Sequence, residues 1–298
     1  MKKVKDILLY RIIARLFPLK YKLNFLIHEY IDYKESIIIP YFNGFEICII
    51  PNPGNIWTIS DLIFEGPRYL PEYPLIEEIK QKLPKRFTYV DIGANIGTTV
   101  WLFAREAGKV YAFEPIPRLG DTIRNSIQVN GVSNVMLIGK AIGDREGNAS
   151  MLDSDNSNVV LEGDVESLKV IINTLDSELV NAGMVDFIKI DVEGFEFSVL
   201  KGADNIIRTY RPRLLVEFHP SFVKKYGADG NLVIDFIEQR GYRISYYSFL
   251  NSQRFSKVGR FLTRFMKSGK RFNDKNAFLQ DLQVKPELSS YHLYCEPQ

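Results

Sequence analysis

The feature that most constrains the fold is an alternation of apolar strands with helices that begins at Phe87. Strands that read as nearly continuous apolar runs between helices predict a parallel sheet covered on both faces. We expect strands in the segments FTYVDIG, KVYAFEP, NVMLIGKAIG, MVDFIKIDV, RLLVEFHP, YRISYYSFL and SSYHLYCE, and a hairpin or loop over 144–159. We expect helices over 74–83, 96–107, 117–130, 195–207 and 229–240.

Before the sheet, the sequence predicts a separate extension. Residues 36–50 read as two strands joined at Asn43-Gly44, a dipeptide typical of tight hairpins. The first segment, MKKVKDILLYRIIARLFPLKYK, predicts an amphipathic helix, because Arg11 and Arg15 interrupt its apolar run. Those charges argue against a signal peptide and against a bilayer span. We therefore expect an N-terminal helix plus hairpin over 1–73 and the main domain over 74–298.

Composition excludes several classes of protein. With 298 residues, 46% hydrophobic and 25% charged, the chain can bury a substantial core and is neither disordered nor fibrous. Its two cysteines, Cys48 and Cys295, are too few for a disulfide framework or a cysteine-rich metal site. Both lie among apolar residues, which favours buried thiols in a reducing cytosol.

A glycine-containing turn follows the first strand of the alternation. Asp91, Gly93, Asn95 and Gly97 stand directly before a helix, and Glu114 ends the next strand 21 residues after Gly93. In parallel sheets, ligands bind beyond the carboxyl ends of the strands, and an acidic residue at this place meets the hydroxyls of a cofactor ribose. The alternative is a turn that only packs strand against helix.

The turn departs from the dinucleotide-binding pattern. Asn95 stands where the second glycine of G-x-G-x-x-G should be, and the Asp91 carboxylate is poorly placed for a pyrophosphate. A carboxylate here suits a ligand with a cationic amino group. The methionine part of S-adenosylmethionine is such a ligand.

These residues belong to a longer series of motifs. D-x-G-A-N-x-G, F-E-P, A-I-G-D, I-K-I-D-V-E-G-x-E and P-R-x-L-x-E follow one another between about residues 61 and 219. In this order the series resembles the FkbM family of S-adenosylmethionine-dependent methyltransferases. The resemblance implies the Rossmann-like class I methyltransferase fold, an α/β sheet of seven mostly parallel strands with an antiparallel last strand.

The resemblance also implies a cofactor site. The turn, with Asp91, Gly93, Asn95 and Gly97, would hold the methionine part of S-adenosylmethionine, and Glu114 would hold the ribose. Ala141, Ile142 and Asp144, at the end of the third strand, would border the adenine. The implied activity is O-methylation of a hydroxyl on a sugar or glycan, which includes a lipid-linked one, or on a polyketide-type natural product.

Ionisable residues end the fourth and fifth strands. Asp191 is our first choice for the group beside the transferred methyl, and Lys189, two residues earlier, would orient it. His219 is the alternative general base, because its ordinary pKa of ~6.5 is near neutral. Glu193 and Glu217 are expected on the substrate side. A structural interpretation also stays open, in which Glu217 pairs with Lys189 and His219 caps the strand end.

A divalent metal is a less favoured interpretation of the same residues. Asp191, Glu217 and His219 could converge as two carboxylates and one imidazole around an ion that acidifies the acceptor hydroxyl.

Two other functions fit the sequence less well. A non-catalytic module could keep the cofactor fold to bind a glycan or a partner, although the intact turn and Glu114 argue against this. DNA amino-methylation is disfavoured, because the fourth strand is followed by Asp191-Val192-Glu193-Gly194 and no Pro-Pro pair occurs in the chain.

The formal charge of +2 conceals an uneven distribution. Residues 1–24 carry +6 and residues 251–286 carry +7, which leaves −11 for the rest of the chain. Within 250–286, basic and apolar residues recur at helical spacing and predict a basic amphipathic insertion. These two segments could pack on the domain, cover an anionic acceptor or contact a membrane surface. The protein would then be cytoplasmic, either free or peripheral at the inner face of the membrane.

Overall fold

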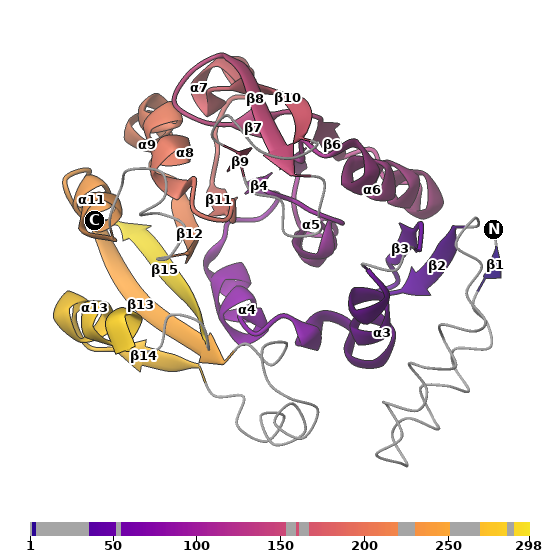
Figure 1. Ribbon diagram of the computed structural model, residues 1–298, viewed down its shortest axis with the longest axis horizontal. Helices are drawn as coiled ribbons and strands as arrows, with labels where there is room; N and C mark the ends of the chain where they lie inside the picture. Colours follow the sequence, from indigo (N-terminus) through magenta and orange to yellow (C-terminus); the bar gives the residue numbers. More distant parts are fainter. Residues whose placement is uncertain are drawn as a thin grey trace.

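The structure is a computed structural model that describes residues 2–3, 36–51, 55–152, 159–160, 167–219, 230–250, 269–284 and 289–298. Its central sheet has eight strands among these residues (Figure 1). In order across the sheet, they are β14 (Lys270–Phe272), β13 (Tyr242–Leu250), β15 (Ser289–Pro297), β12 (Arg213–Phe218), β11 (Phe187–Ile190), β4 (Thr88–Ile92), β5 (Lys109–Phe113) and β6 (Val135–Ile138).

Strand directions confirm the expected sheet. Strands β12, β11, β4, β5 and β6 are mutually parallel, whereas the last strand, β15, is antiparallel to both of its neighbours, β12 and β13. The edge strand β14 is an addition that the sequence analysis missed. It comes from the expected insertion, is antiparallel to β13, and buries Phe272 while its two basic residues stay exposed. A three-residue strand with two exposed charges carries no periodic signal.

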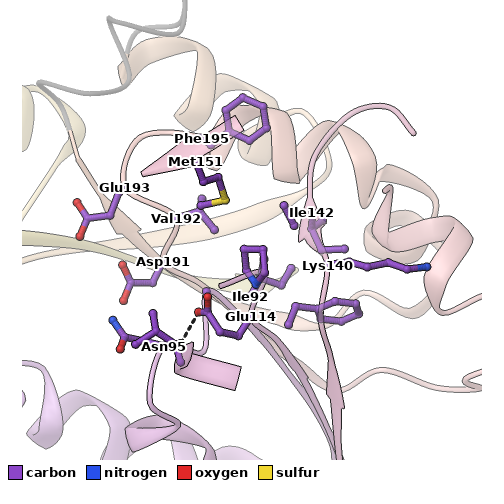
Figure 2. A pocket seen from close by; sticks show the side chains of 15 residues that line it. Ile92, Asn95, Glu114, Lys140, Ile142, Met151, Asp191, Val192, Glu193 and Phe195 are labelled. Atoms are coloured by element: carbon purple, nitrogen blue, oxygen red, sulfur yellow. Dashed lines mark hydrogen bonds between the residues drawn. The ribbon is translucent and has the colours of Figure 1, made fainter. Parts of the chain in front are cut away.

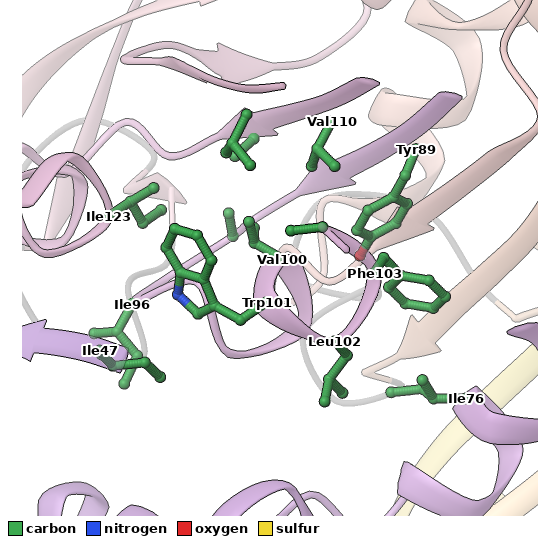
Figure 3. Packing of buried hydrophobic residues seen from close by; sticks show 14 of the residues in the cluster. Ile47, Ile76, Tyr89, Ile96, Val100, Trp101, Leu102, Phe103, Val110 and Ile123 are labelled. Carbon is green, nitrogen blue, oxygen red and sulfur yellow. The ribbon is translucent and has the colours of Figure 1, made fainter. Parts of the chain in front are cut away.

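Alternating residues of the strands enter two apolar clusters. In β4, Tyr89 belongs to one cluster and Val90 to the other, as successive side chains of a strand point to opposite faces. The first cluster centres on the fully buried Trp101 and Phe103 (Figure 3). Buried residues on both faces explain why the strands read as continuous apolar runs.

Helices contribute apolar side chains to both clusters. The first cluster contains residues of α3 (Ile56–Glu65), α4 (Tyr73–Lys82), α5 (Thr98–Phe103) and α6 (Pro117–Asn130). The 3-10 helix η1 (Gly66–Tyr69) joins α3 to α4. The second cluster contains residues of α7 (Leu175–Glu178), α8 (Glu196–Gly202), α9 (Asp204–Tyr210), α11 (Gly230–Glu238) and α13 (Lys275–Val284). The helix expected over 195–207 is thus divided, because the backbone leaves helical geometry at Ala203.

The hairpin expected over 36–50 is present as β2 (Ile37–Pro40) and β3 (Glu46–Ile49). Its turn places Asn43 at φ 47° and Gly44 at φ 85°, the left-handed pair that this dipeptide favours. Lys2 and Lys3, which were expected in a helix, form the short strand β1 (Lys2–Lys3) along the free edge of β2. The rest of the expected N-terminal helix lies outside the described residues, and the division at residue 73 stays a prediction.

A second, four-stranded sheet corrects the analysis of the middle of the chain. It has the order β7 (Ala141–Ile142), β10 (Ser167–Asn173), β8 (Gly147–Leu152) and β9 (Val159–Val160) among the described residues. The single strand expected over 134–143 therefore ends at Ile138 in the central sheet, and residues 141–142 pair with β10 instead. The partner that decides this pairing is about 30 residues away along the chain.

Two further observations concern membrane contact. No helix among the described residues is both long and apolar enough to cross a bilayer. Residues 251–268, which make up about half of the expected basic amphipathic insertion, lie outside the described residues.

Candidate active site

The turn after β4 brings two loops into backbone contact. Gly93 has φ 82°, and a Cβ atom built on it would lie 1.9 Å from the carbonyl oxygen of Asp191. Only glycine therefore lets the turn pass the loop after β11 at this distance. Gly97, at φ 83°, is the N-cap of α5, which explains why the helix begins at Thr98 and not at residue 96.

Glu114 is fixed at the end of β5 by two backbone groups. The N–H of Asn95 donates to its Oε2 at 2.8 Å (Figure 2), and the N–H of Ile116 donates to its Oε1 at 2.9 Å. Burial raises the pKa of Glu114 to about 8, although both hydrogen bonds act against that rise. The Glu114 carboxyl group thus links the turn after β4 to the turn after β5, and these bonds hold it at the wall of the pocket.

Asp91 lies beneath the turn and is fully buried. Its Oδ2 accepts a hydrogen bond from the Thr99 hydroxyl at 2.5 Å, which ties β4 to α5. Its Oδ1 has no hydrogen-bond partner among the described residues. Burial raises the pKa of Asp91, and the charge of Lys189 offsets part of the effect. Asp91 thus connects the strand to the helix beneath the turn.

A pocket opens between these loops at the carboxyl ends of β4, β5 and β11 (Figure 2). Its lining residues are Ile92, Gly93, Asn95, Phe113, Glu114, Pro115, Leu119, Lys140, Ala141, Ile142, Met151, Asp191, Val192, Glu193 and Phe195. The structure therefore brings Gly93, Asn95, Glu114, Ala141 and Ile142 around one cavity. Asp144 is not among the lining residues, because it faces α8, where it forms an ion pair with Lys201 and accepts from Ser198 at 2.9 Å.

Asp191 lines the pocket, and the buried side chain of Lys189 fixes the position of its carboxylate. The Lys189 ammonium, 3% exposed, donates to Asp191 Oδ2 at 2.8 Å. Burial alone would lower the pKa of Lys189, but the carboxylates of Asp191, Asp91 and Glu217 outweigh it and raise the pKa. Lys189 is therefore a permanent cation that fixes one oxygen of Asp191. Lys189 thus contacts Asp191, and the alternative pairing with Glu217 is not found among the described residues.

His219 lies among three carboxylates. Its Nδ1 is 2.8 Å from Glu196 Oε1, and its Nε2 is 3.4 Å from Glu193 Oε2. Burial would lower the pKa of His219, but the hydrogen bond with Glu196 and the negative charges of Glu193 and Glu217 raise it to about 10. At neutral pH the ring is an imidazolium, which donates hydrogen bonds and has no free lone pair.

Glu196 is the site residue that sequence reasoning missed. Glu196 is the last residue of the motif I-K-I-D-V-E-G-x-E, but the motif alone does not indicate its role. The side chain is fully buried, and Oε1 accepts both from the backbone N–H of Gly194 and from His219. Its burial is visible only in the structure, and a buried glutamate needs a specific partner, which here is His219.

Glu193 and Glu217 have opposite electrostatic environments. Glu193 lines the pocket at φ 51°, and burial raises its pKa to about 7 despite the charge of His219. Burial also opposes ionisation of Glu217, but His292, His219 and Lys189 hold its pKa well below the usual range.

The expected metal ligands do converge: one atom each of Asp191, Glu217 and His219 lie within 4.8 Å of one another. Both nitrogens of His219, however, are directed at the glutamates Glu193 and Glu196. Magnesium would in any case prefer oxygen ligands and water. A metal at this position stays a prediction.

Strand order, the glycine turn and the acidic residue after β5 together define the class of protein. Six parallel strands and an antiparallel seventh strand inserted between the fifth and the sixth, with a ligand pocket at the carboxyl ends of the parallel strands, make up the class I methyltransferase fold.

Comparison with known families gives a specific assignment within this class. Residues 91–244 match the family model described as the methyltransferase FkbM domain, and the chain belongs to that family. This assignment agrees with the series of motifs found between about residues 61 and 219.

Individual relatives are more distant. The chain is 30% identical over 170 residues to the hexuronic acid methyltransferase AglP of Haloferax volcanii, covering 55% of this chain and 66% of that protein. It is 16% identical to a solved methyltransferase FkbM of Methylobacillus flagellatus, with TM-score 0.39 over 82% of this chain and 56% of the other. It is 12% identical to a solved rRNA methylase of Streptococcus thermophilus, with TM-score 0.43 over 76% and 97% of the two chains.

Proposed function

We propose that the protein transfers the methyl group of S-adenosylmethionine to a hydroxyl of a sugar or glycan. The observation that carries the proposal is Asp191, a pocket-lining carboxylate whose backbone touches the cofactor turn and whose Oδ2 is held by Lys189. The relative AglP, named as a hexuronic acid methyltransferase, supports the acceptor class.

The cofactor supplies an activated methyl group, and the chain's own residues supply alignment and proton removal. With Oδ2 of Asp191 bonded to Lys189, we assign Oδ1 as the atom that accepts the acceptor's hydroxyl proton. His219 is unsuited to this role below about pH 10, because its ring already carries the proton. It instead keeps Glu193 and Glu217 in place and can donate to an acceptor oxygen.

Asp91 and Glu114 serve the cofactor in this proposal. The Asp91 carboxylate, buried beneath the turn, contributes negative charge near the cationic amino end, and Glu114 accepts from the ribose hydroxyls. Ala141 and Ile142 offer an apolar wall for the adenine. Asp144, by its pairing with Lys201, positions the loop that carries this wall.

The test is methyl transfer by the purified full-length chain. We would supply S-adenosylmethionine with a labelled methyl group and compare uronic acid oligosaccharides, neutral oligosaccharides and polyketide alcohols as acceptors. Label on a sugar hydroxyl supports the proposal. Label only on a polyketide hydroxyl redirects it, and tight cofactor binding without transfer to any acceptor favours a non-catalytic module.

Replacing Asp191 tests its assignment as the base. We expect Asp191→Asn to lower kcat about 10²–10⁴-fold while cofactor affinity changes little. Asp121→Asn is the control, because Asp121 pairs with Arg124 on the solvent side of α6, away from the pocket. A kcat of Asp191→Asn within twofold of the parent would reject the assignment.

A further inference from the structure

A second group of potential ligands lies behind the acceptor cluster. Glu72 precedes α4, Glu217 is on β12, and His292 is on β15, opposite Glu217 in the strand register. One ligand atom of each lies within 4.8 Å of the others. Glu72 and His292 are 4% and 0% exposed, so these groups are shielded from water in a way that surface acidic clusters are not.

His292 has unmet bonding capacity. Neither of its ring nitrogens has a hydrogen-bond partner among the described residues. Nε2 points toward the cluster and lies 3.5 Å from Glu217 Oε2, while the ring of Phe249 packs edge-on at 5.3 Å between centroids. A fully buried imidazole without hydrogen bonds costs free energy unless a ligand satisfies it.

Two carboxylates share this part of the core. Glu72 and Glu217 both face the His292 imidazole, while Lys189 donates to Asp191, and His219 lies on the other oxygen of Glu217. Buried carboxylates are normally paired or bound to metal ions. Two ligands held at ~2.1 Å from a tetrahedral ion are about 3.4 Å apart. The Nε2–Oε2 separation of 3.5 Å already matches that span.

We propose that Glu72, Glu217 and His292 bind one divalent transition-metal ion of the zinc type. Two carboxylates and one imidazole, which gives up any proton when it binds the ion, suit such an ion better than magnesium or calcium, which favour all-oxygen sites. The ion joins the start of α4 to β12 and β15, which lie side by side (Figure 1). Glu217 keeps its other oxygen, Oε1, toward His219 at 3.7 Å. The site is structural and does not depend on the proposed acceptor.

The test uses Co²⁺ as a spectroscopic substitute for Zn²⁺. Full-length protein would be stripped with a chelator and titrated with Co²⁺, followed by displacement with Zn²⁺. We expect one equivalent of Co²⁺ to give visible absorption bands that Zn²⁺ abolishes, and a melting temperature raised by about 2–4 °C at saturating Zn²⁺. Glu72→Gln and His292→Gln should weaken binding at least tenfold.

Two matched variants separate this site from the neighbouring one. His219→Gln and Asp191→Asn remove ligands of the other carboxylate–imidazole group only, and both should bind Co²⁺ like the parent. Circular dichroism confirms folding, and Glu72→Gln replaces His292→Gln if the latter does not fold. Absence of saturable binding by the parent would overturn the proposal. Loss of binding in His219→Gln with retention in Glu72→Gln would also overturn it.

Discussion

Single residues determine which chemistry the pocket can perform. Asp191 and His219 end neighbouring strands, and the sequence makes Asp191 the first choice and His219 the alternative for the base. The three glutamates around His219 separate them, because they hold its ring in the protonated form. The deciding partner, Glu196, is 23 residues from His219, so no local pattern could reveal it.

Gly93 tests the contact between the two loops. We expect Gly93→Ala to cost about 3 kcal/mol of unfolding free energy, from left-handed strain plus overlap with the Asp191 carbonyl, and to reduce cofactor affinity. Gly131→Ala is the control, because Gly131 has φ 60° and nothing within 4 Å of its Cβ position. Only the backbone strain, about 1 kcal/mol, should appear there. Equal losses by urea unfolding would contradict the loop contact.

The buried Glu114 carboxyl group should make the stability of the folded chain depend on pH. Glu114 keeps its proton up to about pH 8 in the folded chain, whereas the free side chain has a pKa of 4.5. Between these values Glu114 is ionised only in the unfolded chain, so the free energy of unfolding falls as pH rises. Glu114→Gln removes this effect. We expect its melting temperature, relative to the parent, to increase steadily from pH 5 to pH 8, while calorimetry shows at least tenfold weaker cofactor binding. A pH-independent difference in melting temperature would show that Glu114 is not buried as an acid.

At the level of helices and strands, local signals were sufficient where the geometry is local. The Asn43-Gly44 turn, the helix over 117–130 and the strand over 242–250 occur where the sequence predicts them. Pairing between distant segments was not predictable. The second sheet depends on β10 meeting β7 and β8, and the edge strand β14 depends on β13. Apolar periodicity contains no information about such partners.

The N-terminal hairpin is attached to α6 by hydrogen bonds. The side chain of Asn130 accepts from the Glu46 N–H at 2.7 Å and donates to the Glu46 carbonyl at 2.6 Å. We expect Asn130→Ala to lower the unfolding free energy by about 1–3 kcal/mol, since both groups are partly buried. The exposed Gln128→Ala on the same helix should change it by less than about 0.5 kcal/mol. Equal effects in denaturant titrations would mean that the hairpin does not depend on this contact.

For the whole molecule, the charge distribution raises the question of an anionic partner. The two basic segments carry +6 and +7 against −11 for the remainder. We expect the full chain to float with vesicles that contain anionic lipid, at low salt, and much less with neutral vesicles or at high salt. Such binding would fit a lipid-linked glycan acceptor. Failure to float with either vesicle would remove membrane contact from the proposal.

The most direct test of the proposed function is mass spectrometry of cellular glycans. Cells that lack the gene would be compared with cells that carry the parent chain or Asp191→Asn. We predict that one methyl group on a sugar hydroxyl is present with the parent chain and absent both without the gene and with Asp191→Asn. Identical glycan masses in all three would contradict glycan methylation, and a methyl group restored by Asp191→Asn would contradict the role of Asp191.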